Sequence, residues 1–296
     1  MLERMKRAAR DRVVRAMTEA NAIQSAELGE SLTAARRELA TAREEIADLR
    51  TRLDAVPEQI LASEIRSRRD LFAAAEREAA STSARFVGQH FLRARNYPHP
   101  HDTLRAALAL APSGGMVLEF GVYSGTTLGI LAAARTETVF GFDVFTGLPE
   151  DWRPGFRAGA FVPEGDLPEV EGADLVVGLF EDTLPGFLDE HPGPVDLAHV
   201  DCDLYSATVT VLAQVGPRLR PGAVVVFDEY FNHQNWEIGE HQAWVEHVER
   251  TGLTFEYVAY THDSEQVAVQ VLTNPQWAES TGSDVETAVP HDETNA

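Results

Sequence analysis

The chain has 296 residues, of which 25 are Lys or Arg and 47 are Asp or Glu, giving a formal net charge of −22. Acidic and basic side chains balance in residues 1–80, so residues 81–296 carry the whole negative excess. Such an acidic surface repels phosphate backbones and argues against a nucleic-acid partner. The length suits one large α/β domain with an appendage.

Two residue types are almost absent from the chain. Its only cysteine is Cys202, which excludes a disulfide framework and a cysteine-based zinc site. Its only lysine is Lys6, so a P-loop ATPase, a pyridoxal enzyme and a Schiff-base aldolase are excluded as well. No apolar run approaches the roughly 20 residues of a membrane span, and the charged N-terminus does not resemble a secretory signal. We therefore expect a cytoplasmic protein.

A heptad repeat over residues 28–60 predicts an N-terminal coiled coil. Its apolar positions alternate four and three residues apart, with charged residues between them. A long helix packed on its own domain is the alternative, but the narrow seam favours self-association into a homo-oligomer. The two columns of the seam are Leu32, Leu39, Ile46, Leu53 and Ile60, and Leu28, Ala35, Ala42, Leu49 and Val56.

The regions beside the heptads complete the predicted domain organisation. Pro57 is expected to end or kink the helix, with a second helical stretch over residues 58–80. The basic and apolar residues before the heptads indicate either a solvated helix start or a helix lying on a membrane surface. The acidic residues 279–296 contain few apolar side chains and predict a disordered tail. The predicted domains are thus residues 1–80, 81–278 and 279–296.

The central domain is predicted to be α/β. Uninterrupted apolar runs indicate strands buried on both faces, hence a parallel sheet with helices on either side. The last two strands, joined by a short polar turn, form an antiparallel hairpin. The predicted strands are residues 117–122, 138–142, 175–179, 195–200, 223–227, 254–260 and 266–272, and the predicted helices are 126–135 and 206–219.

A glycine-containing segment follows the first predicted strand. Gly121 and Gly125 allow the backbone to turn sharply and to approach a ligand at the start of the next helix. Their GxxxG spacing differs from both the dinucleotide fingerprint and the P-loop. Asp143 ends the next strand, where a carboxylate suits the two hydroxyls of a ribose, although a turn or cap is the alternative. The two features together favour ligand binding.

Four carboxylates end two further strands. Asp201 and Asp203 follow one strand, and Asp228 and Glu229 follow the next. In a doubly wound sheet these strand ends open on one crevice beside the glycine segment. Each residue alone is also a common turn former, but four converging carboxylates repel one another unless a cation binds. Oxygen ligands favour Mg²⁺, with Mn²⁺ or Ca²⁺ as alternatives, over zinc.

These segments together resemble the class I S-adenosylmethionine-dependent methyltransferases, specifically the macrocin O-methyltransferase-like family. The resemblance covers roughly residues 85–275 and leaves out the coiled coil and the tail. It implies a Rossmann-like sheet that ends in an antiparallel hairpin. The residues that carry it are 118–125 (LEFGVYSG), 141–143 (GFD), 145–152 (FTGLPEDW), 178–185 (GLFEDTLP), 199–206 (HVDCDLYS) and 227–230 (FDEY).

The resemblance also implies roles for individual residues. Asp143 would bind the ribose of S-adenosyl-L-methionine, and Glu181 and Asp182 would flank its adenine. The metal ligands would be Asp201, Asp228 and Glu229, with Asp203 as the general base. Relatives methylate sugar hydroxyls of glycosylated natural products with a bound Mg²⁺. Glu119, Gly121 and Gly125 would hold the methionine portion of the donor. The other expected donor-binding positions are Tyr123, Ser124, Thr126 and Asp201.

The expected reaction moves a methyl group from a sulfonium to an oxygen. A cation lowers the pKa of the acceptor hydroxyl, and a neighbouring base takes its proton. His233 is a second candidate for that base; His199 and His241 are rivals, of which His199 is better explained by packing. The loop 145–161, with Trp152 and Phe156, is predicted to cover the acceptor, opposite Phe231 and Trp236.

Two other functions remain open. One is methylation of a catechol or other phenol, which uses the same magnesium chemistry. The other is a non-catalytic coiled-coil scaffold whose Rossmann-like domain only binds a nucleoside ligand. The expected partners of the enzyme are a small-molecule or glycan acceptor and further copies of the chain.

Overall fold

The structure is a computed structural model that describes residues 1–282, apart from the side chains of Glu3 and Arg4. It divides into a first unit, Met1–Asp70, and a second unit that begins at Leu71, ten residues before the predicted boundary. Helix α8 (Pro275–Thr281) includes residues 279–281, so these first residues of the predicted disordered tail are helical instead. The rest of that tail, from residue 283, lies outside the described residues.

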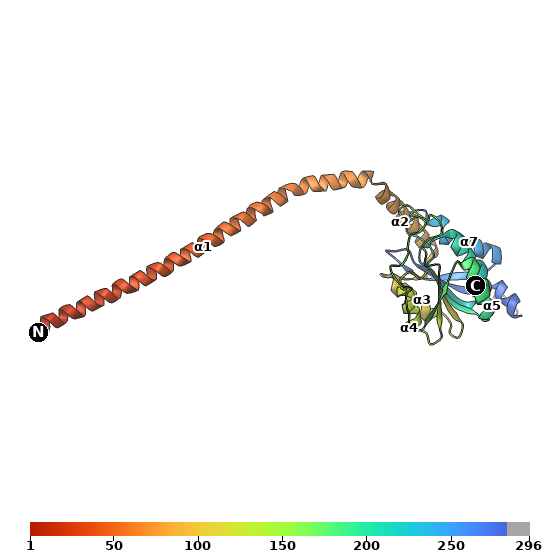
Figure 1. Ribbon diagram of the computed structural model, residues 1–296. Helices are drawn as coiled ribbons and strands as arrows, with labels where there is room; N and C mark the ends of the chain where they lie inside the picture. Colours follow the sequence, from red (N-terminus) through yellow and green to blue (C-terminus); the bar gives the residue numbers. More distant parts are fainter. Residues whose placement is uncertain (283–296) are drawn as a thin grey trace, which may run out of the picture. The chain divides into compact units, whose positions relative to one another are not determined.

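The first unit consists of helix α1 (Leu2–Arg69). The helix does not end at Pro57, because a proline removes one backbone donor while the other hydrogen bonds of a long helix persist. Figure 1 shows α1 bending within its orange segment, which contains Pro57. The break comes at Asp70, whose backbone is extended. The predicted helical stretch over residues 58–80 is helical apart from Asp70, but its bounds are wrong, because its first part belongs to α1 and its last to α2 (Leu71–His90).

The second unit contains one eight-stranded sheet in the order β1-β7-β8-β6-β5-β2-β3-β4. Neighbouring strands are parallel except around β8, which is antiparallel to both β6 and β7. All seven predicted strands are present, and the class I methyltransferase sheet with its hairpin is confirmed. The strands are β1 (Arg95–Tyr97), which was not predicted, β2 (Met116–Phe120), β3 (Val139–Asp143), β4 (Ala173–Val177), β5 (Val195–Val200), β6 (Leu219–Phe227), β7 (Thr254–Thr261) and β8 (Val267–Thr273).

Helices cover both faces of this sheet. One hydrophobic core packs α3 and α4 against the side chains of one face, and a second packs α2, α5, α6 and α7 against the other. Successive residues of β2 enter different cores, Val117 one and Leu118 the other, as expected for strands covered on both sides. The helices are α3 (Pro100–Leu110), α4 (Thr126–Ala133), α5 (Phe180–Glu190), α6 (Tyr205–Val215) and α7 (Glu240–Thr251).

Helix α2, which begins the second unit, is fixed to the rest of that unit by polar and aromatic contacts. The Thr82 hydroxyl accepts a hydrogen bond from Trp236 Nε1 at 2.9 Å, and the Ser83 hydroxyl accepts one from the Asn232 amide at 2.8 Å. The Phe86 ring packs 5.2 Å from the Trp236 ring. Among the described residues, no helix is both long enough and apolar enough to cross a membrane.

The variant Thr82→Val tests this anchoring of α2. It keeps the volume of the side chain but leaves the buried Trp236 indole N–H without its acceptor, which costs about 1–2 kcal/mol. All four tryptophans lie between residues 152 and 277, so tryptophan fluorescence during urea unfolding follows the second unit. The exposed neighbour Ser81→Ala is the control and should leave the midpoint unchanged. Equal midpoints for the two variants would show that the bond does not stabilise the unit.

Candidate active site

The carboxyl ends of the parallel strands surround a cavity of about 630 Å³. Its wall combines the segment after β2, the end of β3, the loop after it, and the segments that follow β4, β5 and β6. This edge of a doubly wound sheet is where ligands bind. The predicted site residues that line the cavity are Gly121, Tyr123, Asp143, Glu181, Asp201, Asp203 and Glu229.

The glycine segment passes directly over the end of β5. Gly121 has φ +95°, and a Cβ built there would lie 1.7 Å from the backbone oxygen of Asp201. Gly125 has φ +76° and precedes the first turn of α4. Only glycine therefore permits this approach at position 121, and the predicted close turn is confirmed.

Asp143 organises the glycine segment from the end of β3. Its Oδ2 accepts hydrogen bonds from the amides of Val122 and Tyr123 at 2.8 and 2.9 Å. Its Oδ1 accepts one from the Phe145 amide at 2.7 Å, which is the turn-forming role considered as an alternative. The carboxylate also lines the cavity, so its binding to ribose stays a prediction.

The other predicted donor-binding residues lie outside the cavity wall. Glu119 is fully buried on β2, behind the cavity. The Ser124 and Thr126 hydroxyls are 3.0 Å apart at the exposed start of α4, next to Gly125. Asp182 is exposed in the first turn of α5, one residue beyond Glu181. A direct role of these side chains in donor binding stays a prediction.

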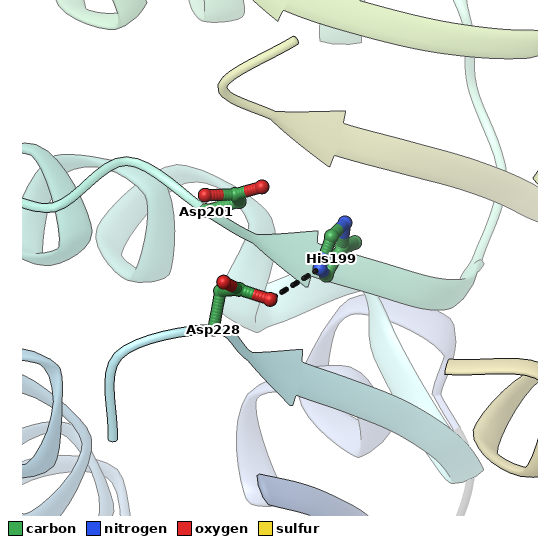
Figure 2. A group of neighbouring side chains, drawn as sticks. All are labelled: His199, Asp201 and Asp228. Carbon is green, nitrogen blue, oxygen red and sulfur yellow. Dashed lines mark ion pairs between the residues drawn. The ribbon is translucent and has the colours of Figure 1, made fainter. Parts of the chain in front are cut away.

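Asp201 and Asp228 lie together at the ends of neighbouring strands (Figure 2). Val200 of β5 pairs with Phe227 of β6, which brings the following residues side by side. One ligand atom each from Asp201, Asp228 and His199 lies within 4.8 Å of the others. The structure thus groups two of the three predicted metal ligands and adds His199. Glu229 is not in this group, although it lines the cavity.

His199 lies between two carboxylates. Its Nδ1 is 2.8 Å from Glu119 Oε1, and its Nε2 faces Asp228 Oδ1 at 3.6 Å. Burial by itself would lower the pKa of His199, but the two carboxylates outweigh burial and raise the pKa well above its ordinary value. Both ring nitrogens face carboxylates, an arrangement that favours the protonated imidazole.

The same packing shifts the pKa values of the neighbouring carboxyl groups in opposite directions. Burial, reinforced by the charge of Asp228, raises the pKa values of Asp201 and Glu229 well above their ordinary range. Burial would also raise the pKa of Asp228, but the facing His199 imidazolium lowers it. One cation thus offsets only part of the negative charge, and Asp201 and Glu229 remain short of positive partners.

These residues fit a divalent cation. Asp201 and Asp228 supply adjacent carboxylate oxygens, and Glu229 Oε2 is buried without a hydrogen-bond partner. A buried polar atom without a partner calls for an explanation such as an ion. The oxygen ligands of these carboxylates suit Mg²⁺.

Of the two candidate bases, only Asp203 faces the cavity. It has φ +63° and its pKa is raised to about 7; burial is the main cause, opposed by Arg153 and reinforced by Asp228. His233 lies outside the cavity wall, and its ring nitrogens are 3.0 and 3.1 Å from the backbone oxygens of Gln234 and Glu229. No nitrogen faces the acceptor space, so the structure does not support the predicted role of His233 as a base.

An aromatic loop covers the remaining side of the cavity. Trp152, Phe156 and Phe161 line it, in agreement with the prediction for residues 145–161. The Arg153 guanidinium stacks 3.9 Å over the Trp152 ring and pairs with Glu265 at 3.0 Å, which ties the loop to the β7–β8 turn. The predicted opposite wall is wrong: Phe231 and Trp236 are buried in the core beside α2.

Three contributing residues had no signal in the sequence. Glu240, fully buried at the start of α7, accepts a hydrogen bond from the Glu229 amide at 2.9 Å through Oε2. Gln266 Nε2 donates to Asp228 Oδ2 at 3.1 Å, and Arg153 acts as described above. Their partners lie 11, 38 and 112 residues away in the chain, and no local spacing marks such contacts.

Comparison with known proteins finds similarity to methyltransferases over part of the chain. Residues 118–230 match a family model described as a methyltransferase domain, while no curated protein matches the chain. Among solved structures, the calicheamicin methyltransferase CalS11 is 27% identical, with 57% of this chain and 76% of that chain covered and a TM-score of 0.47. The O-methyltransferase NovP is 22% identical, with 58% and 79% covered and a TM-score of 0.46.

A third solved structure, MycE with Mg, SAH and mycinamycin VI, is 16% identical, with 65% of this chain and 51% of that chain covered and a TM-score of 0.40. All three TM-scores are below 0.5. The family match coincides with the strands and segments that build the cavity, from β2 to the residues after β6. Over these residues the chain is therefore similar to a methyltransferase domain.

Proposed function

We propose that the chain is a magnesium-assisted O-methyltransferase whose acceptor is a sugar hydroxyl of a glycoside or glycan. One observation carries the proposal: the glycine segment, the candidate base Asp203 and the aromatic loop all line the same cavity. The carboxylates of Asp201 and Asp228 meet at the same strand ends. A donor and an acceptor that bind these walls therefore meet beside the carboxylates.

Different residues of the chain have different roles in the proposed reaction. Bound S-adenosylmethionine supplies the methyl group, and Mg²⁺ held by Asp201, Asp228 and Glu229 would lower the pKa of the acceptor hydroxyl. Asp143 and the amides it holds shape the donor side of the cavity. Asp203 takes the hydroxyl proton, because its raised pKa suits a base at neutral pH. Alignment of the two reactants in one cavity contributes the rest of the rate acceleration.

The aromatic loop supports a sugar acceptor. The Phe156 and Phe161 rings stack at 5.3 Å beside Trp152, and such apolar rings suit the faces of a sugar. The same rings also suit a catechol, which remains the second candidate acceptor. Methylation of a glycoside panel against a catechol panel separates the two, with methyl transfer followed by mass spectrometry.

Calorimetry with S-adenosylmethionine, with and without Mg²⁺, tests the proposal on wild type and on Asp143→Ala. We expect micromolar donor binding by wild type and its loss in the variant, because the variant removes three hydrogen bonds that shape the donor side. Asp174→Ala, an exposed carboxylate on β4, is the control and should bind the donor normally. A wild type that binds no donor under either condition would favour the scaffold function. Donor binding without any heat from Mg²⁺ would remove the metal from the proposal.

A further inference from the structure

Helix α1 carries a continuous apolar seam that its own unit leaves uncovered. The eight large side chains of the seam have exposed fractions between 39% and 68%. Soluble proteins rarely leave a row of leucine and isoleucine side chains in water, and a spacing of 3.5 residues is the pattern that a second helix covers. These side chains are Leu28, Leu32, Leu39, Ile46, Leu49, Leu53, Val56 and Ile60.

The spacing of the seam fixes the heptad position of every neighbouring residue. Position d follows a by three residues, so the column that begins at Leu32 is a and the column that begins at Leu28 is d. The residues just before the a positions then occupy g, and those just after the d positions occupy e. Position g contains Glu38, Glu45 and Arg52, whereas the charged residues at position e are Arg36, Arg43 and Arg50.

The charges at these positions distinguish the two directions in which helices can pair. In a parallel pair in register, each g residue faces the e residue of the next heptad on the other helix. Glu38 then faces Arg43 of the second copy, and Glu45 faces Arg50 of the second copy. In an antiparallel pair, g faces g and e faces e, so the three arginines at e would face one another. Opposite charges at e and g set the orientation of coiled coils.

We propose that α1 binds the α1 helix of a second copy of this chain, parallel and in register. The alanines at d support two helices over three, because Ala35 and Ala42 are too small to fill the wider core of a three-helix coil. The partner is therefore one further copy of the chain, and the arginines at e disfavour the opposite direction.

A disulfide test measures direction and register on the full chain. In the parallel pair the two copies of residue 35 face each other, so Ala35→Cys should form a disulfide-linked dimer under mild oxidation. In an antiparallel pair residue 35 faces the far end of the seam, and no such bond forms. Thr51→Cys is the control, because residue 51 lies at f on the outer face. The natural Cys202 is buried, and alkylation before denaturation keeps it out of the reaction.

A charge-reversal series tests the same proposal without new cysteines. Light scattering should give wild type twice the mass of one chain. Glu38→Arg with Glu45→Arg places Arg against Arg, and we expect the dimer dissociation constant to rise at least tenfold. Adding Arg43→Glu and Arg50→Glu should restore the wild-type value. A monomeric or trimeric wild type, or a reversed variant that pairs as tightly as wild type, would overturn the proposal. Unchanged donor binding in each variant confirms that the second unit is folded.

Discussion

Gly121→Ala is expected to destabilise the second unit by about 4 kcal/mol or more and to abolish donor binding. The added Cβ would lie 1.7 Å from the Asp201 backbone oxygen, and neither backbone can move without shifting the end of a central strand. Overpacking of a rigid site costs about 1–3 kcal/mol or more, and a left-handed backbone adds about 1–2 kcal/mol for a residue with a Cβ. Tryptophan fluorescence in urea and calorimetry with S-adenosylmethionine measure the two effects.

Gly114→Ala is the control that separates the steric clash of an added Cβ from the strain of a residue with positive φ. Gly114 has φ +93°, close to the value at Gly121, yet a Cβ there meets no atom within 4 Å. This variant should lose only about 1–2 kcal/mol and should bind the donor as wild type does. If the two variants were equally stable, the close approach at Gly121 would not be the reason for glycine at that position.

The sequence predicted the parts of the fold that follow from local patterns. Val195–Val200 is a strand at its predicted bounds, and all six of its residues are buried, as expected for a strand covered on both faces. The predicted helix over residues 206–219 ends early, at Val215, since Gly216 and Pro217 stop it. Strand β6 then begins at Leu219, four residues before the start of the predicted strand 223–227. Boundaries that depend on a single turn are therefore the least predictable.

The candidate site was predictable in outline because strand ends of a parallel sheet converge. Asp201 and Asp228 could be placed together from their positions alone. The role of His199 could not, because one of its two carboxylate partners, Glu119, lies eighty residues earlier in the chain. His233 was misplaced for a similar reason: its distance from Tyr230 in sequence gives no indication that its ring faces two backbone carbonyls. Side-chain direction comes from packing, which the sequence pattern does not specify.

Asp203→Asn is expected to lower kcat by about 10²–10⁴-fold while donor binding remains. The asparagine amide has the same size as the aspartate carboxyl, but it cannot accept the proton of the acceptor hydroxyl. Asparagine also tolerates the left-handed backbone at this position, where φ is +63°, so the fold is preserved. Glu150→Gln is the matched control: this carboxylate also lines the cavity, but it accepts a hydrogen bond from the Ser206 hydroxyl at 2.6 Å and has no part in proton removal.

The pH profile supplies a second measure of the same role. A base must be ionised, and burial holds the pKa of Asp203 at about 7, so activity should rise as the pH increases through 7 and level off above it. Added Mg²⁺ favours the ionised carboxylate and should move this rise to lower pH. The Asn variant, measured at saturating donor, should lose the rise altogether. A variant that keeps both its activity and the rise would assign proton removal to another group, and the raised pKa of Asp203 would then reflect burial alone.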